Sequence, residues 1–170
     1  DTRWAEWNGA YRDDIRKFIR SDEGMVPILA ARIIGSPDIY VNPHQDINQS
    51  IHFVSCHDGF TMGDLVSYNC KHNLPNGEDN RDGLDENFSC NYGVEGATDD
   101  PAIEAVRERQ VRNFMTAMFF TQGTPMFVMG DEVRRTQFGN NNAYCQNNPS
   151  AWFDWNDLER HGQTFEYTRK

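Results

Sequence analysis

The chain has 170 residues, of which 38% are hydrophobic, and this proportion is compatible with one globular domain. It carries 26 acidic and 16 basic residues, and the formal net charge of -10 would repel phosphate backbones and anionic membrane surfaces. No apolar run approaches the roughly 20 residues that would span a bilayer. The sequence therefore predicts a soluble chain that binds neither nucleic acid nor membranes.

The first part of the sequence predicts a strand followed by two helices. Residues 4–7 form a short aromatic segment, and Asn8 then suits the N-cap of a helix. Apolar residues recur on one face of this helix, at Tyr11, Ile15, Phe18 and Ile19. Residues 25–34 predict a second short helix, which the sequence Gly-Ser-Pro at 35–37 would end.

Residues 51–56 are β-branched, aromatic and almost continuously apolar, as in a buried strand of a parallel sheet. This predicted strand leads directly into His57 and Asp58. A helix with capping-box spacing at its start is predicted over residues 61–68. The His-Asp pair is therefore expected at a strand-to-helix junction.

A long polar segment follows, over residues 69–100. It is rich in Asn, Asp, Gly and Glu, and loops of this length in compact domains are usually functional or disordered. We expect a functional loop. Asp100 and Pro101 then favour a helix start, and the apolar spacing predicts a long amphipathic helix ending at Gly123.

Residues 125–129 predict a third buried strand, followed by Asp131 and Glu132. Strands that alternate with helices indicate an α/β architecture with parallel strands. A doubly wound sheet and a (β/α)8 barrel both fit, and in either fold ligands bind at the carboxyl ends of the strands. The residue pairs His57-Asp58 and Asp131-Glu132 are both expected at these strand ends.

The pair His57-Asp58 offers chemistry suited to sugars. The imidazole and the carboxylate can hydrogen-bond vicinal hydroxyls, and an ionised Asp58 can oppose the positive charge of an oxocarbenium-like centre. The residues alone leave capping of the following helix about equally open. Asp131 and Glu132 are similarly either functional carboxylates or a helix cap with its first-turn acid.

Aromatic residues near the predicted strand ends and in loops can stack on the apolar faces of sugars or fill the core. They include Trp4, Trp7, Tyr68, Tyr92, Tyr144 and Trp152.

The four cysteines form no Cys-x-x-Cys pair, and the five histidines lie between them without zinc-ligand spacing. We therefore expect reduced thiols in a cytosol-like compartment and no cofactor. A metal site is a remote alternative, because several candidate ligands lie close together in sequence: His44, Asp46, His52, His57 and Asp58.

Four long motifs follow one another in a fixed order, at residues 4–14, 51–61, 65–83 and 122–146, and the likeness they carry extends over nearly the whole chain. They resemble motifs of the isoamylase and glycogen-debranching group of the α-amylase superfamily, glycoside hydrolase family 13. The first, second and fourth motifs are similar to the sixth, seventh and eighth strands of the family's barrel. The third resembles the loop that distinguishes debranching members from ordinary α-amylases.

This resemblance implies that residues 1–170 are part of a catalytic (β/α)8 barrel, with the upstream strands and a C-terminal β-domain outside the chain. It implies hydrolysis of α-1,6 branch linkages in glycogen-like α-glucans by a retaining mechanism. Asp58 would be the catalytic carboxylate that stabilises the transition state. His57, Trp7 and Asp131 would bind or shape the substrate, without a metal or other cofactor.

In the family pattern, the nucleophilic Asp and the general-acid Glu belong upstream of Asp1. We therefore expect little hydrolase activity from the isolated chain, and self-association through its unpaired strand edges. An amylase relative that acts on α-1,4 bonds, a non-catalytic glucan-binding module and a metal-dependent hydrolase are the alternatives. The family resemblance is compatible with the cytoplasm or, in a plant, a plastid.

Overall fold

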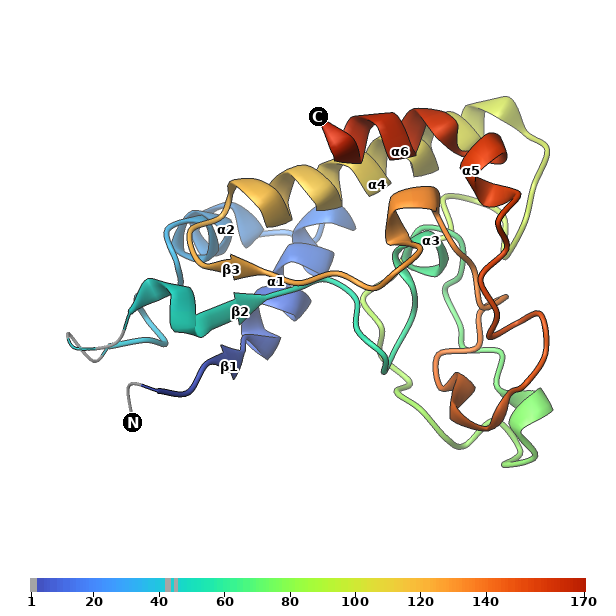
Figure 1. Cartoon of the computed structure of the whole chain (residues 1–170), viewed down its shortest axis with the longest axis horizontal. Helices are drawn as coiled ribbons and strands as arrows, with labels where there is room; N and C mark the ends of the chain where they lie inside the picture. Colours follow the sequence, from blue (N-terminus) through green and yellow to red (C-terminus); the bar gives the residue numbers. More distant parts are fainter. Residues whose placement is uncertain (1–2, 42–43, 45) are drawn as a thin grey trace. The chain divides into compact units, whose positions relative to one another are not determined.

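The computed structural model describes residues 3–41, 44 and 46–170, which fall into two units (Figure 1). The first, which we call the sheet unit, consists of Asp1–Val54 and Asn113–Phe127. The second, which we call the loop unit, consists of Ser55–Arg112 and Val128–Lys170. In the described residues no helix has the length and apolarity needed to cross a membrane.

The sheet unit contains three short parallel strands, β1 (Glu6–Trp7), β2 (Ser50–His52) and β3 (Thr124–Pro125). Their order in the sheet is β1-β2-β3, and both pairings are parallel. The predicted α/β class and parallel strands are therefore confirmed. In this sheet, strands that are neighbours in space are also consecutive in sequence.

Two of the strands are shorter than the sequence predicts. The Val54 carbonyl accepts hydrogen bonds from Nε and Nη2 of Arg16, at 2.8 and 2.5 Å, so a side chain occupies a group that a longer strand would use for pairing. The predicted strand over residues 51–56 is therefore wrong at its carboxyl end, because β2 ends at His52. The predicted strand 125–129 ends early as well, because the Val128 amide donates to the Asp131 carboxylate at 3.1 Å.

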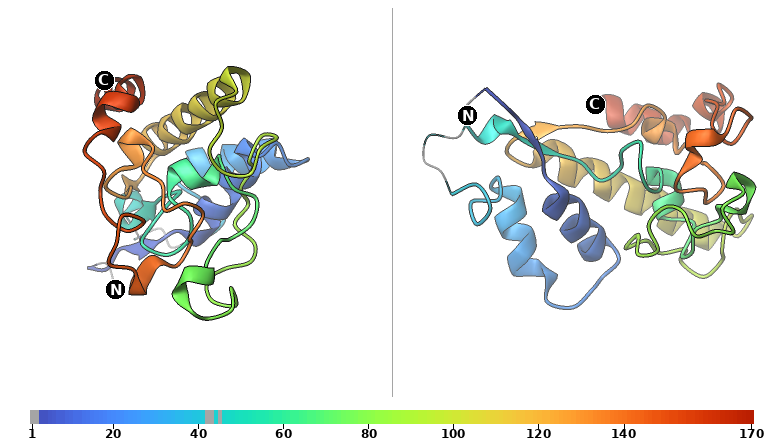
Figure 2. Two further views of the ribbon diagram at one scale, coloured as in Figure 1. Left: turned by 90° about the vertical axis from the view of Figure 1, so that its right-hand side faces the viewer. Right: turned by 90° about the horizontal axis from the view of Figure 1, so that it is seen from below.

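Helices α1 (Gly9–Ile19) and α2 (Met25–Ile33) pack against each other in the sheet unit (Figure 2). The Asn8 side chain accepts from the Tyr11 amide at 2.9 Å, which confirms Asn8 as the N-cap of α1. The buried face of α1 includes Tyr11, Ile15 and Ile19, as the spacing predicts, whereas Phe18 of the same predicted face is only partly buried.

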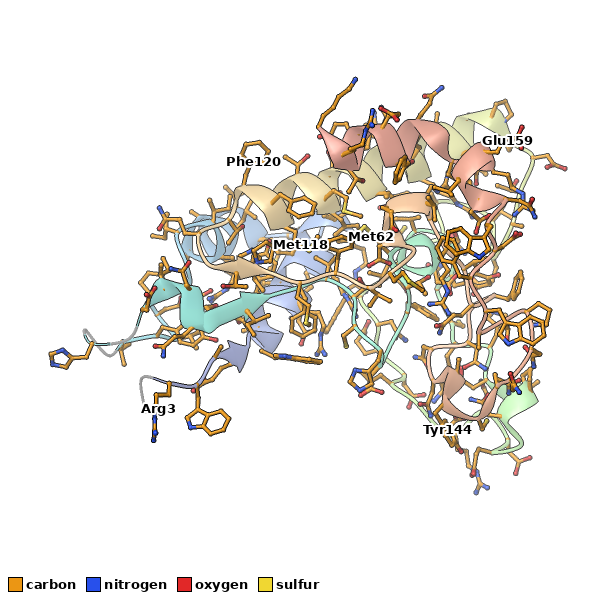
Figure 3. All side chains as sticks on the ribbon, viewed as in Figure 1. Arg3, Met62, Met118, Phe120, Tyr144 and Glu159 are labelled. Carbon is orange, nitrogen blue, oxygen red and sulfur yellow. The ribbon has the colours of Figure 1, made fainter. Side chains whose placement is uncertain are left out.

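Helix α4 (Pro101–Phe120) begins where Asp100-Pro101 predicts, and it ends before Gly123. Its first part belongs to the loop unit and its last part to the sheet unit. In the sheet unit, Met118 is fully buried, whereas Phe120 projects from the end of the helix and is 81% exposed (Figure 3). The carbonyl of Met118 is hydrogen-bonded to Nε2 of His52 at 2.8 Å, which joins this helical end to β2.

The loop unit contains helices α3 (Met62–Leu65), α5 (Asp157–Arg160) and α6 (Gly162–Arg169). The described part of the loop unit also contains the 3-10 turns η2 (Leu74–Asn76), η3 (Asp131–Val133) and η4 (Ala143–Cys145). A further 3-10 turn, η1 (Ile47–Gln49), lies in the sheet unit. Over residues 69–100, η2 is the only helical or strand element, so the predicted long loop is confirmed.

Helix α3 is much shorter than the predicted helix over residues 61–68. The Leu65 carbonyl accepts from the Cys90 amide at 3.0 Å, and the Ser67 carbonyl accepts from the Gly96 amide at 2.7 Å. Two carbonyls that a longer helix would use are therefore occupied by the long loop. Thr61 still caps the helix, accepting from the Asp64 amide.

Candidate functional site

His57 and Asp58 lie on an exposed turn of the loop unit. The imidazole Nε2 is 3.4 Å from Asp58 Oδ2, and the two side chains are 73% and 70% exposed. Strand β2 ends at His52, so the predicted direct junction between strand and pair is wrong. The N-cap of α3 is Thr61, and this removes helix capping as the explanation for Asp58. The pair is thus an imidazole and a carboxylate open to solvent, side by side, as recognition of vicinal hydroxyls requires.

Hydrogen bonds within the loop unit hold this turn. The Cys56 thiol donates to the Asp58 carbonyl at 3.0 Å. The next amide, that of Gly59, donates to the Asn141 carbonyl at 2.9 Å. Gly59 has a φ of 93°, in the left-handed region that favours glycine. The turn therefore has a defined conformation although the side chains of His57 and Asp58 are exposed.

Asp131, predicted to bind or shape the substrate, is 1% exposed. Its Oδ1 accepts from the Met62 amide at 2.9 Å, and its Oδ2 accepts from the Val128 amide and the Ser55 hydroxyl. Burial raises the pKa of this carboxyl group, and the three hydrogen bonds oppose that rise. Since Ser55 and Met62 flank the His-Asp turn in sequence, Asp131 fixes both ends of the segment that carries it.

Glu132, the neighbour of Asp131, makes a local contact. Its Oε2 accepts from the Gly130 amide at 2.8 Å, at the start of η3. The N-cap of η3 is Gly130, so Asp131 is not the cap, and both acids lie in the first turn.

Trp7, the predicted aromatic contact for substrate, lies on β1 in the sheet unit and is 50% exposed. Its ring meets that of Phe53 edge to face, with centroids 5.5 Å apart and an interplanar angle of 61°. The half of Trp7 that remains exposed is available for stacking on a sugar.

A group of amide side chains, which we call the asparagine cluster, joins two distant parts of the loop unit: Asn73, Asn76, Asn140, Asn141 and Asn142. Asn73 Nδ2 donates to Asn141 Oδ1 at 2.8 Å, and Asn140 Nδ2 donates to Asn76 Oδ1 at 2.8 Å. Sequence reasoning missed these pairings. The only signals were the polar composition of residues 69–100 and the Asn run at 140–142.

The same long loop is closed on itself by Glu95. Its carboxylate accepts from the amides of Asn69 and Cys70, from Asn91 Nδ2 at 2.8 Å and from His72 Nε2 at 3.1 Å. Burial acts to raise the pKa of Glu95, but these hydrogen bonds outweigh it and lower the pKa to about 2. The ionised carboxylate therefore joins the two ends of this loop.

Glu95→Gln is expected to weaken the loop unit at neutral pH by on the order of 1 kcal/mol, after allowance for solvent screening. A carboxyl group whose pKa is lowered on folding stabilises the fold above its unfolded pKa of 4.5, and this contribution is lost as the pH falls towards 2. Urea unfolding between pH 7 and pH 2 checks this. The variant should show a flatter decline than the original chain, and Glu78→Gln on the same loop should not. Parallel pH profiles for the original chain and Glu95→Gln would refute the assignment.

Among the residues that the structure describes, no cluster of three or more His, Cys, Asp or Glu side chains is arranged to hold a metal ion. The four cysteines are free thiols in the structure. The imidazole of His57 and the carboxylate of Asp58 are groups that can hydrogen-bond hydroxyls, and a carboxylate can stabilise positive charge.

Comparison with curated proteins finds relatives that are named glycogen operon protein GlgX homologs and isoamylases. The Glycogen operon protein GlgX homolog of Mycobacterium tuberculosis is 49% identical over 167 residues, which are 98% of this chain and 23% of the relative. Isoamylase 3, chloroplastic, of Oryza sativa subsp. japonica is 51% identical over 162 residues, 93% of this chain and 20% of the relative. The chain thus spans about a fifth to a quarter of the length of these relatives. No family model matches it.

Solved structures that resemble this chain in fold include pullulanases. The pullulanase from Bacillus acidopullulyticus aligns with a TM-score of 0.70 at 21% identity, over 96% of this chain and 17% of its own. A mutant pullulanase from Paenibacillus barengoltzii, solved in complex with maltotetraose, aligns with a TM-score of 0.66 at 20% identity, over 97% of this chain and 23% of its own. At this identity the likeness shows a shared α/β fold.

The relatives found by sequence identify the family. The chain belongs to the isoamylase and glycogen-debranching group of the α-amylase superfamily of glycoside hydrolases. The resemblance carried by the four motifs is confirmed.

Proposed function

We propose that the chain carries one part of the active site of a hydrolase that cleaves α-1,6 branch linkages in glycogen-like α-glucans by a retaining mechanism. The observation that carries this proposal is the solvent-open pair of His57 and Asp58, on a turn held by the buried Asp131. The family membership supplies the substrate class. A cytoplasmic location, or a plastid one in a plant, is part of the same proposal, and the rice relative is named chloroplastic.

The proposed architecture is a segment of a (β/α)8 barrel, at about strands six to eight. A sheet in which β1, β2 and β3 are parallel and follow one another in sequence supports it, because barrel strands succeed one another in this way. In sequence, the His57-Asp58 turn follows the carboxyl end of β2, and the sites of such barrels are built from the segments that follow the carboxyl ends of their strands.

In this proposal the Asp58 carboxylate opposes the positive charge that develops at the sugar's anomeric centre. His57 donates a hydrogen bond to a hydroxyl of the same sugar. Retaining hydrolysis also needs a nucleophile and a general acid about 5 Å apart. The family resemblance assigns the nucleophile to barrel strand four and the general acid to strand five, which precede strands six to eight in the family's barrel.

Segment exchange tests the proposed function. Residues 1–170 replace the matching part of the Mycobacterium tuberculosis relative, and hydrolysis of pullulan is compared with that of linear maltohexaose. We expect kcat/KM for pullulan to exceed that for maltohexaose at least about tenfold, equivalent to about 1.4 kcal/mol of transition-state discrimination. Faster hydrolysis of maltohexaose would favour the α-1,4-acting alternative, and glucan binding without turnover would favour a binding module. The unmodified relative is the control.

A further inference from the structure

We propose that Asn141 is a positioning residue that sets the conformation of the His57-Asp58-Gly59 turn and connects it to the long loop over residues 69–100. This inference rests on the proposed function for the role of the turn. Its structural basis lies entirely within the loop unit.

The backbone of Asn141 bonds in two directions. Its carbonyl accepts from the Gly59 amide at 2.9 Å, immediately after Asp58. Its amide donates to Asn73 Oδ1 at 3.0 Å, and Asn73 Nδ2 donates back to Asn141 Oδ1 at 2.8 Å. The turn and the long loop are therefore bonded to the same residue.

The Asn141 side chain is 1% exposed, and its hydrogen-bonding groups are all engaged. Besides the bond to Asn73, its Nδ2 donates to the Leu84 carbonyl at 2.8 Å and to Asn87 Oδ1 at 2.9 Å. An unpaired buried amide is costly, so the side chain has little freedom to rotate without disturbing these partners. Because the side chain is held in this way, the backbone carbonyl that accepts from the Gly59 amide is held in place too.

Close packing at Gly83 restricts the same residue. A Cβ atom at Gly83 would overlap Asn141 Oδ1 and lie 2.8 Å from Asn73 Nδ2. Gly83 also has a φ of 70°, which favours glycine. The long loop therefore approaches the Asn73-Asn141 pair so closely that the position of Gly83 has no room for a larger side chain.

This arrangement lets Asn141 act on the position of the Asp58 turn, in addition to any effect on the stability of the fold. A group that stabilises a transition state must be held in place by its neighbours, and a misplacement of about 1 Å can cost about 100-fold in rate. The Gly59 amide is the direct link between Asn141 and the Asp58 turn. Loss of that link should loosen the turn and weaken glucan binding there, while the sheet unit keeps its fold.

Asn141→Asp in the full 170-residue chain tests the proposal. The carboxylate keeps the shape of the amide but removes both Nδ2 donors and places an acceptor opposite the Leu84 carbonyl and Asn87 Oδ1. The readouts are hydrogen exchange of the Gly59 amide and the Kd for panose, a glucose trisaccharide with one α-1,6 bond. We expect exchange at Gly59 to accelerate, and the Kd to rise, each at least about tenfold. Exchange at Met115 in the sheet unit should stay unchanged.

Asn76→Asp is the matched control, because Asn76 belongs to the same cluster and bonds to Asn140, Asn142 and Asp82. Exchange at Gly59 should stay within about twofold of the original chain in this variant. Equal acceleration in Asn76→Asp and Asn141→Asp would overturn the proposal, because any damage to the cluster would then suffice. Unchanged exchange at Gly59 in Asn141→Asp would overturn it as well.

Two further outcomes are separable. If Asn141→Asp does not fold, Asn87→Ala removes a single partner of Nδ2, and exchange at Gly59 should then rise about threefold; no rise would refute the proposal. If the original chain does not bind panose, the proposed function fails, and the exchange data still decide whether Asn141 positions the turn. Panose binding that is unaffected by a loosened turn would refute the positioning role.

Discussion

Asp131→Ala is expected to lower the free energy of unfolding of the loop unit by about 3 kcal/mol. The substitution leaves three donors without their acceptor: the amides of Met62 and Val128 and the hydroxyl of Ser55. Each unpaired buried group costs about 1–3 kcal/mol, and the relief of carboxylate burial offsets part of the sum.

Urea unfolding at pH 7, followed by hydrogen exchange at amides of the loop unit, measures this effect. Asp131→Asn keeps one acceptor oxygen and should cost less than Asp131→Ala. The exposed Asp99→Ala should change stability by less than about 0.5 kcal/mol. Stability of Asp131→Ala within that same margin would contradict the role assigned to the buried carboxylate.

Asp58→Asn is expected to lower pullulan hydrolysis by the segment-exchanged relative at least about 100-fold in kcat/KM. The amide keeps the size of the side chain and loses its negative charge, so it cannot oppose charge at the anomeric centre. Because the Asp58 side chain is 70% exposed, we expect no measurable loss of stability. Steady-state kinetics with pullulan, together with thermal unfolding, measure the two effects.

Asp79→Asn is the matched control for Asp58, since it makes the same chemical change on an 86% exposed side chain in the loop unit. Its kcat/KM should stay within about twofold of the parent value. Equal rates for Asp58→Asn and Asp79→Asn would remove Asp58 from the proposed chemistry.

Elements with local signals were predictable from the sequence. Asn8 caps α1, Pro101 begins α4, and Thr61 caps α3, because each signal acts on residues within one helical turn. The parallel sheet was predictable from the alternation of strands and helices. These features depend on neighbouring residues and on the order of elements, both of which a sequence displays.

Element lengths depend on distant partners and could not be predicted in the same way. The Val54 carbonyl is occupied by Arg16, 38 residues away in sequence, which shortens the expected β2. The carbonyls of Leu65 and Ser67 are occupied by amides of the long loop, which shortens α3. Apolar periodicity carries no information about such bonds.

The candidate site was predictable to a similar extent. The pairing of His57 with Asp58 follows from their adjacency, and the structure places both side chains in solvent. The inward orientation of Asp131 was not predictable, because its partners Ser55 and Met62 lie 76 and 69 residues away. The Asn73-Asn141 pair spans 68 residues, and composition alone indicates only that polar loops are present.

The location of the glucan site on the His57-Asp58 turn is tested most directly by titrating the isotopically labelled 170-residue chain with panose and following its backbone amide resonances. The account predicts that the largest shift changes fall on His57, Asp58 and Gly59 and that Asp58→Asn reduces them. Changes centred elsewhere in the loop unit, for example near the exposed Trp152, with none at the turn, would contradict it.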